Sequence, residues 1–130
     1  MESNITVQDA VTTLTQTLTQ TLTEALTEAL NVLRDEMRQE IRETRLRIDD
    51  VDYNSRARLR NSAITRPEYI VSPLKNLDTH QVVKLPETAR ELSALRTAEV
   101  EHYLQQLGQV PVGSAEEKRT QLTEFIGINY

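Results

Sequence analysis

The residue types that most often bind metals or transfer protons are few in this chain and widely spaced. It has two histidines, His80 and His102, and no cysteine. Zinc sites need clusters of histidine, cysteine and carboxylate ligands at short spacings, and these two histidines belong to no such cluster. A nucleophilic serine needs a neighbouring base, and no serine here lies in an elbow motif. We therefore expect neither a metal site nor a catalytic triad.

Carboxylate pairs are the other candidates for chemistry, because two nearby carboxyl groups can share acid and base roles. The candidate pairs are Asp49 with Asp50, Glu116 with Glu117, and Glu99 with Glu101. Each pair falls on a polar helix face or at a helix start, where acidic residues are favourable in any case. The three glycines are too dispersed for a phosphate-binding loop. The sequence therefore predicts a protein that is not an enzyme and binds no cofactor.

The distribution of helix-breaking residues divides the chain into two parts. All 3 glycines and all 4 prolines lie after residue 60. A long segment without them predicts one helix, and the segment rich in them predicts several short elements. We expect residues 1–55 to form a coiled-coil helix and residues 56–130 a small C-terminal domain. The expected fold class is mainly α.

An apolar ladder runs through the first part at helical spacing. Its 13 positions cover 44 residues in 12 steps, about 3.67 residues per step, which is close to the period of an 11-residue repeat. The only polar member is Thr44. The ladder consists of Val7, Val11, Leu14, Leu18, Leu22, Leu26, Leu30, Leu33, Met37, Ile41, Thr44, Ile48 and Val51.

The threonine-rich repeat over residues 14–30 has a second interpretation, because threonine favours strands. A strand would mix leucine with glutamine on one face, whereas a helix gathers the leucines. The ladder also continues beyond the repeat, which favours the helix. One exposed apolar stripe of this length needs a partner helix. The partner is either another copy of the chain or a different protein, and small threonine and alanine residues beside the ladder leave more than two strands open.

The second part has start and stop signals for short elements. Residues 61–85 are expected to be extended, either as an irregular connection or with a hairpin that pairs residues around 69–74 with 81–85. A helix is predicted to open over Leu85-Pro86-Glu87-Thr88, with Pro86 near its first turn, and another to be capped by Thr97. Ser114 and Glu117 predict a capping box for the last helix. Because the core of this part is small, we also expect Leu59 to pack onto it.

A set of short motifs in residues 56–128 resembles the C-terminal domain of the meiotically up-regulated-gene family of fungi. The sequence departs from that pattern at His80, where the family has glycine, and at Leu85, where it has phenylalanine. The resemblance implies a fungal source. The family carries no assigned reaction or ligand, so no site residue is transferred. The motifs are Ala57-Arg58-Leu59 with Asn61-Ser62, Pro73-Leu74-Lys75-Asn76, Leu85-Pro86-Glu87-Thr88 with Leu92 and Leu95, Tyr103 to Gly108, and Gly113 with Glu117-Lys118-Arg119 and Gly127.

Nucleic-acid binding is the alternative function. Arg56, Arg58, Arg60 and Arg66 cluster near the junction of the two parts. Residues 97–126 are also similar in outline to the helix–extension–helix of the SAP motif. Phosphate binding needs a net positive surface, however, and acidic residues close by cancel most of this charge.

The favoured function is a non-enzymatic scaffold that forms homo-oligomers and displays its C-terminal domains for binding to another protein. The net charge is −5, and no stretch approaches the length and apolarity of a membrane span. A secretory signal is not apparent at the N-terminus. We therefore expect an intracellular protein, cytoplasmic or nuclear, without a membrane partner.

Overall fold

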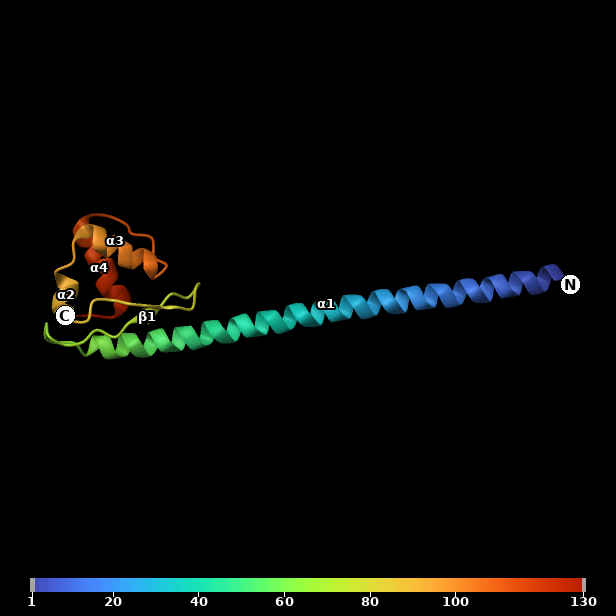
Figure 1. Ribbon diagram of the computed structural model, residues 1–130, viewed down its shortest axis with the longest axis horizontal. Coiled ribbons are helices and arrows are strands. Elements are labelled where there is room, and N and C mark those ends of the chain that lie inside the picture. The colour runs from blue at the N-terminus through green and yellow to red at the C-terminus, as the bar shows by residue number, and fades with distance from the viewer. Residues whose placement is uncertain (1, 130) are drawn as a thin grey trace. The chain divides into compact units, whose positions relative to one another are not determined.

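The computed structural model describes residues 2–129, with side chains from residue 6 onward. The predicted fold class is confirmed: the protein is mainly helical, with a long first helix and a small hairpin (Figure 1). The helices are α1 (Glu2–Ser62), α2 (Ala89–Ser93), α3 (Thr97–Gln106) and α4 (Ala115–Ile126). The strands are β1 (Leu74–Lys75) and β2 (Val82–Val83).

The chain forms two units, residues 1–43 and residues 44–130. Residues 2–43 belong to α1 alone, and the second unit holds the last turns of α1 with every later element. We call the second the compact unit. The boundary predicted between residues 55 and 56 lies inside it.

The threonine-rich repeat of the first unit is helical, as the ladder predicts. Its threonine hydroxyls donate to the carbonyl four residues earlier, Thr17 to Thr13 at 2.8 Å and Thr23 to Thr19 at 2.7 Å. Each of these hydroxyls therefore has a hydrogen-bond partner within the helix, and it does not compete with the helical backbone bonds. Threonine is therefore accommodated here despite its strand preference.

The hairpin is also present, in a shorter form than the predicted range. Leu74 pairs with Val83 and Lys75 with Val82 in antiparallel register, and Ile70 makes an isolated bridge to Thr88. Leu74 is fully buried and Val83 nearly so. The hairpin thus contributes one face to the core.

The core of the compact unit lies between the hairpin, α3, α4 and the end of α1. Its largest fully buried apolar side chains are Leu74, Leu104, Leu122 and Ile126. Leu104 and Leu122 belong to α3 and α4, which pack against each other. Tyr103 and Phe125 lie at the edge of this core.

One of the predicted helix starts is wrong. The residue before α3 is Arg96, whose N–H faces the Glu99 carboxylate at 3.4 Å, so Thr97 lies within the helix and does not cap it. The residue before α2 is Thr88, whose hydroxyl accepts from the Glu91 N–H at 3.2 Å. Pro86 is therefore outside α2. The predicted Ser114 cap is present, with its hydroxyl accepting from the Glu117 N–H at 3.2 Å.

Gly108 and Gly127 both adopt left-handed backbone conformations just after helices, with φ of 80° and 94°. A Cβ on Gly108 would meet Asn76 at an ordinary 3.5 Å, whereas a Cβ on Gly127 would lie 2.8 Å from the Arg58 carbonyl oxygen. A side chain at either position would adopt an unfavourable left-handed conformation, but of the two only Gly127 would also clash with a neighbouring backbone.

The two glycines therefore provide a matched pair of substitutions. We expect Gly108→Ala to lower the free energy of unfolding by about 1 kcal/mol, the cost of a left-handed residue with a side chain. We expect Gly127→Ala to lower it by about 2 kcal/mol or more, because α1 would also have to shift. Urea denaturation of both variants measures the difference, and equal losses would contradict this account of the α1–α4 contact.

Candidate functional site

The predicted ladder lies on α1 with its side chains uncovered. The exposed fraction of its apolar members ranges from 45% at Val51 to 64% at Leu30. Scattered exposed leucines are ordinary in proteins, but a continuous apolar stripe is not. Within a single chain, the residues that the structure describes leave this stripe open to solvent. The ladder is the first of two functional faces of α1.

The second face holds the rest of the compact unit. Asp50, Asn54, Ala57 and Asn61 follow one another at steps of four, three and four residues, so they share one side of the helix. Their exposed fractions are 3%, 1%, 0% and 0%. We call these four residues the docking face. Three of them are polar, which is unusual for a buried helix side.

Asn54 and Asn61 bind the extended segment before and within β1 through their carboxamides. The Asn54 amide donates to the Lys75 carbonyl at 2.9 Å and accepts from the Lys75 N–H at 2.7 Å. Asn61 makes the same two bonds with Ser72, at 2.9 and 2.7 Å, and also donates to the Ile126 carbonyl at 3.0 Å. Each side chain therefore acts as a peptide group would in a neighbouring strand. The backbone N–H and C=O groups of Ser72 and Lys75 are satisfied in this way.

Asp50 extends this contact to the hairpin turn. One carboxylate oxygen makes a short contact with His80 Nδ1, and the other lies 3.4 Å from Lys75 Nζ. The hydrogen bond from His80 holds the pKa of Asp50 below its ordinary value of 3.8, although burial acts in the opposite direction. His80 has a φ of 63°, a left-handed conformation that is uncommon outside glycine. The turn thus brings the His80 ring to α1, although His80 must adopt an unfavourable backbone conformation to do so.

Leu59 does not pack onto the domain, so that prediction is wrong. It is 72% exposed. The side of α1 that faces the core is set by Ala57 and Asn61, and Leu59 falls midway between them in sequence and on another side of the helix. Ala57 permits the close approach that a leucine would block.

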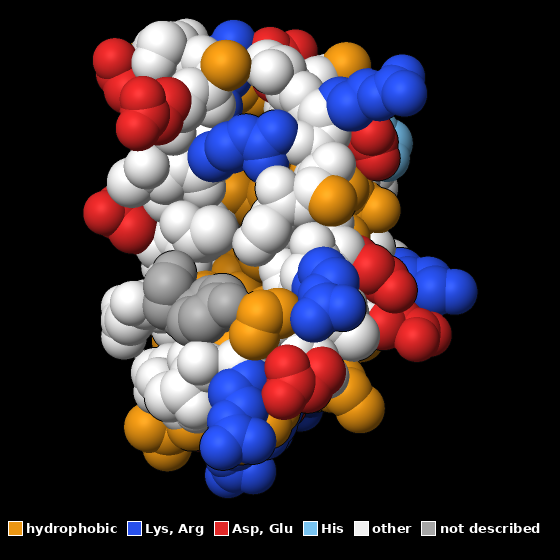
Figure 2. Space-filling model, turned by 90° about the vertical axis from the view of Figure 1, so that its left-hand side faces the viewer, with side chains coloured by type: hydrophobic (Ala, Val, Ile, Leu, Met, Phe, Trp, Pro, Cys, Tyr) orange, Lys and Arg blue, Asp and Glu red, His pale blue; other side chains and the backbone are white. Residues whose placement is uncertain are grey.

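The four arginines of the nucleic-acid hypothesis have different surroundings. Arg58 donates from Nε to the Phe125 carbonyl at 2.7 Å and lies over the Phe125 ring. Arg60 donates to the Ser72 hydroxyl at 3.0 Å, and Arg56 pairs with Asp52 at 3.1 Å. Arg66 is exposed. On the face drawn in Figure 2, basic and acidic side chains alternate and do not gather into one positive patch.

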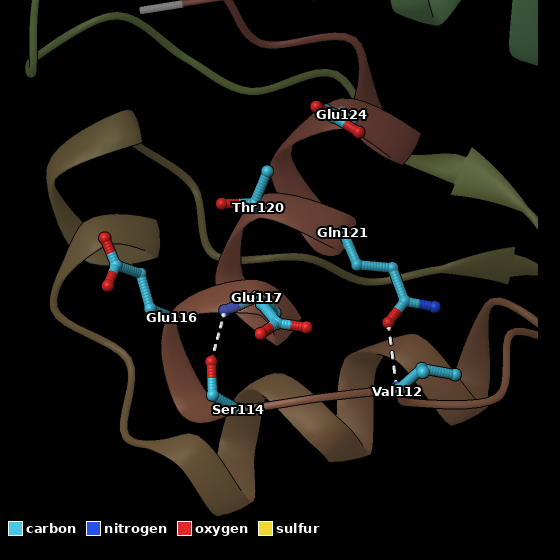
Figure 3. Close-up of a pocket in the computed structure, with 7 residues that line it drawn as sticks. All are labelled: Val112, Ser114, Glu116, Glu117, Thr120, Gln121 and Glu124. Carbon is cyan, nitrogen blue, oxygen red and sulfur yellow. Dashed lines mark hydrogen bonds between the residues drawn. The ribbon is translucent and has the colours of Figure 1, made fainter.

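A hollow of about 530 Å³ beside α4 has acidic residues at its edge (Figure 3). Its lining includes Glu116 and Glu117 from the first turn of α4 and Glu124 from near its end. Glu116 and Glu117 point in different directions, so the carboxylates do not converge on one ligand position. Within residues 2–129, no group of three or more histidine, cysteine or acidic residues is arranged to hold a metal ion.

Comparison with protein-family models, with curated proteins and with solved structures finds no match for this chain. The resemblance to the fungal family stays a prediction. Among the described residues, no helix combines the length and apolarity needed to cross a membrane.

The docking face was not found from the sequence. Its signal is present, because Asp50, Asn54, Ala57 and Asn61 repeat at helical spacing beside the ladder. Polar residues at such spacing are ordinarily assigned to solvent, however, and the partners of Asn54 and Asn61 are backbone groups that leave no mark in the sequence.

Removal of one docking asparagine should destabilise the compact unit. Asn54→Ala leaves the Lys75 N–H and C=O without their partner, and we expect a loss of about 2–3 kcal/mol in the free energy of unfolding. Asn31→Ala is the control, because Asn31 is exposed on α1. Urea denaturation at one protein concentration compares them, and a similar midpoint for both variants would contradict the role of Asn54.

The Asp50 carboxylate should make stability depend on pH. Because its pKa is lower in the folded state, its contribution is present above about pH 4 and is lost as the pH falls through 3.8 and below. We expect Asp50→Asn to be less stable at neutral pH and to lose less stability on acidification. The measurement is the urea midpoint of both proteins from pH 7 to pH 2.5. If the urea midpoints of the two proteins change in parallel with pH, the contact of Asp50 with His80 does not contribute to folding stability.

Proposed function

We propose that this protein is a non-enzymatic scaffold that assembles with further copies of itself through the ladder of α1. Assembly gathers the compact units, which then bind another protein together. Clustering raises the effective concentration of weak sites, so a modest interaction of one unit becomes a strong interaction of the assembly.

The observation that carries the proposal is the uncovered ladder. Its leucines are 55–64% exposed between Leu14 and Leu30. Full burial of one such side chain stabilises by roughly 1.5–3 kcal/mol, so covering the exposed half of each contributes about 1 kcal/mol. Over the whole ladder this sum exceeds the cost of association in most estimates.

A second copy is the occupant that fits this stripe best. The ladder advances by steps of three and four residues, about 3.67 on average, so the same stripe on a second copy can run along it. The chain's other helices have 5, 10 and 12 residues and are too short to cover it. All three contribute buried apolar residues to the core of the compact unit. Among the described residues, no other helix is therefore long enough to cover the ladder.

The contacts of the docking face support a scaffold role for the compact unit. The hydrogen bonds of Asn54 and Asn61 hold the extended segment onto α1 without using any ladder residue. Folding of the compact unit and assembly through the ladder are thus carried by different sides of one helix.

Charges placed in the ladder should separate the copies. We expect Leu22→Glu and Ile41→Asp to weaken assembly by about 2 kcal/mol or more for each copy, because a charged group would be buried without a partner. Gln16→Glu is the control, since it adds the same charge on the side of the helix away from the ladder. Light scattering on a sizing column gives the masses.

The proposal requires a lower mass for the two ladder variants and an unchanged mass for Gln16→Glu. If all three variants have the mass of the unmodified chain, the ladder is not the interface.

A further inference from the structure

The last four positions of the ladder have a more specific geometry than the rest. Ile41, Thr44, Ile48 and Val51 follow one another at steps of three, four and three residues. This is the a/d spacing of a heptad, in which Ile41 and Ile48 are a positions and Thr44 and Val51 are d positions. Ser55 is the next a position.

A hollow of about 440 Å³ lies on this stretch of α1. Its lining consists of Thr44, Arg47, Ile48, Val51, Asp52 and Ser55. These six residues form two overlapping sets of four, 44-47-48-51 and 48-51-52-55. Each set has the i, i+3, i+4, i+7 spacing that receives one knob of a neighbouring helix in a coiled coil. The hollow is therefore a pair of consecutive holes.

In a parallel, in-register pair, the side chain at an a position of one helix enters the hole around the equivalent a position of the other helix. The side chain at a d position enters the hole around the equivalent d position. Ile48 of a second copy would thus enter the first hole, and Val51 of that copy the second. Both side chains are free to do so, since they are 61% and 45% exposed. The docking face lies on another side of α1 and does not cover them.

The charges beside the hollow fit the same arrangement. Arg47 precedes the a position Ile48, and Asp52 follows the d position Val51, five residues later. This g-to-e spacing brings opposite charges together between parallel helices in register. Glu40 and Arg45 repeat it around Ile41. An antiparallel pair that overlaps the whole ladder would place Val51 of one copy opposite Val7 of the other. Arg47 would then lie beside Thr12 of the other copy and would have no carboxylate partner there.

We propose that a second copy of this chain binds this hollow with its α1 parallel and in register, so that Ile48 and Val51 of each copy fill the holes of the other and Arg47 pairs with Asp52 across the interface. The inference rests on the proposed function and adds the orientation. It places both compact units at the same end of the assembly.

Disulfide capture tests the orientation, and the absence of native cysteine makes single cysteines unambiguous. The full chain with Val51→Cys is oxidised at low concentration and compared with Asp49→Cys, whose position is exposed and on another side of α1. Reduced samples of both variants are measured by light scattering. A second oxidation uses an equimolar mixture of mass-tagged Val7→Cys and untagged Val51→Cys.

We expect most of the Val51→Cys protein to become disulfide-linked dimer. The yield of linked dimer should be at least tenfold lower for Asp49→Cys. The mixture should give the two homodimers. If reduced Val51→Cys is oligomeric but the mixture links Val7 to Val51, the helices are antiparallel and this inference is overturned while the proposed function stands. If the reduced proteins are monomers, both are overturned.

The charge pair gives a second test that does not use cysteine. Arg47→Glu should weaken self-association about threefold to fivefold, since two exposed pairs are lost in each dimer. Arg47→Glu combined with Asp52→Arg should recover it, because the reversed pair meets across the same interface. Sedimentation equilibrium measures the dissociation constants, and a double variant weaker than the single one would overturn the pairing.

Discussion

The carboxamides of Asn54 and Asn61 are the interaction on which the compact unit depends. An extended segment with only two short strands cannot satisfy its own backbone, and burial of unpaired N–H and C=O groups is costly. The two asparagines supply the missing partners from α1, at 2.7–2.9 Å for Lys75 and Ser72. They substitute for a neighbouring strand. Without them, the hairpin and its connection to the first helix would lose their support.

This arrangement explains how one helix can have two functions. Polar groups with defined geometry hold the compact unit on one side, and the apolar ladder remains free on another. Had the domain been held by leucines, as we expected for Leu59, apolar residues would lie on both sides and α1 would have no unique face for assembly. The buried polar contacts therefore contribute specificity as well as stability, a role known for polar residues in coiled-coil registers.

The sequence predicted those features that depend on spacing along the chain. The long helix follows from the ladder, and the Ser114 cap follows from local chemistry. The docking face was missed because its partners are backbone groups of residues 72–75, and their position depends on tertiary structure. The start of α3 was misplaced by one residue, because the Glu99 carboxylate accepts from the Arg96 N–H and Thr97 lies inside the helix. His80 at a left-handed position was noticed only as a departure from glycine, and its contact with Asp50 explains why a histidine is there.

The central claim is that the chain assembles with itself through α1. The most direct test is the mass of the full unmodified chain in solution, measured by light scattering over a tenfold range of concentration. The account predicts a whole multiple of 14.9 kDa that persists on dilution to micromolar concentration. A mass of 14.9 kDa at every concentration would contradict it, and the ladder would then need a different protein as its partner.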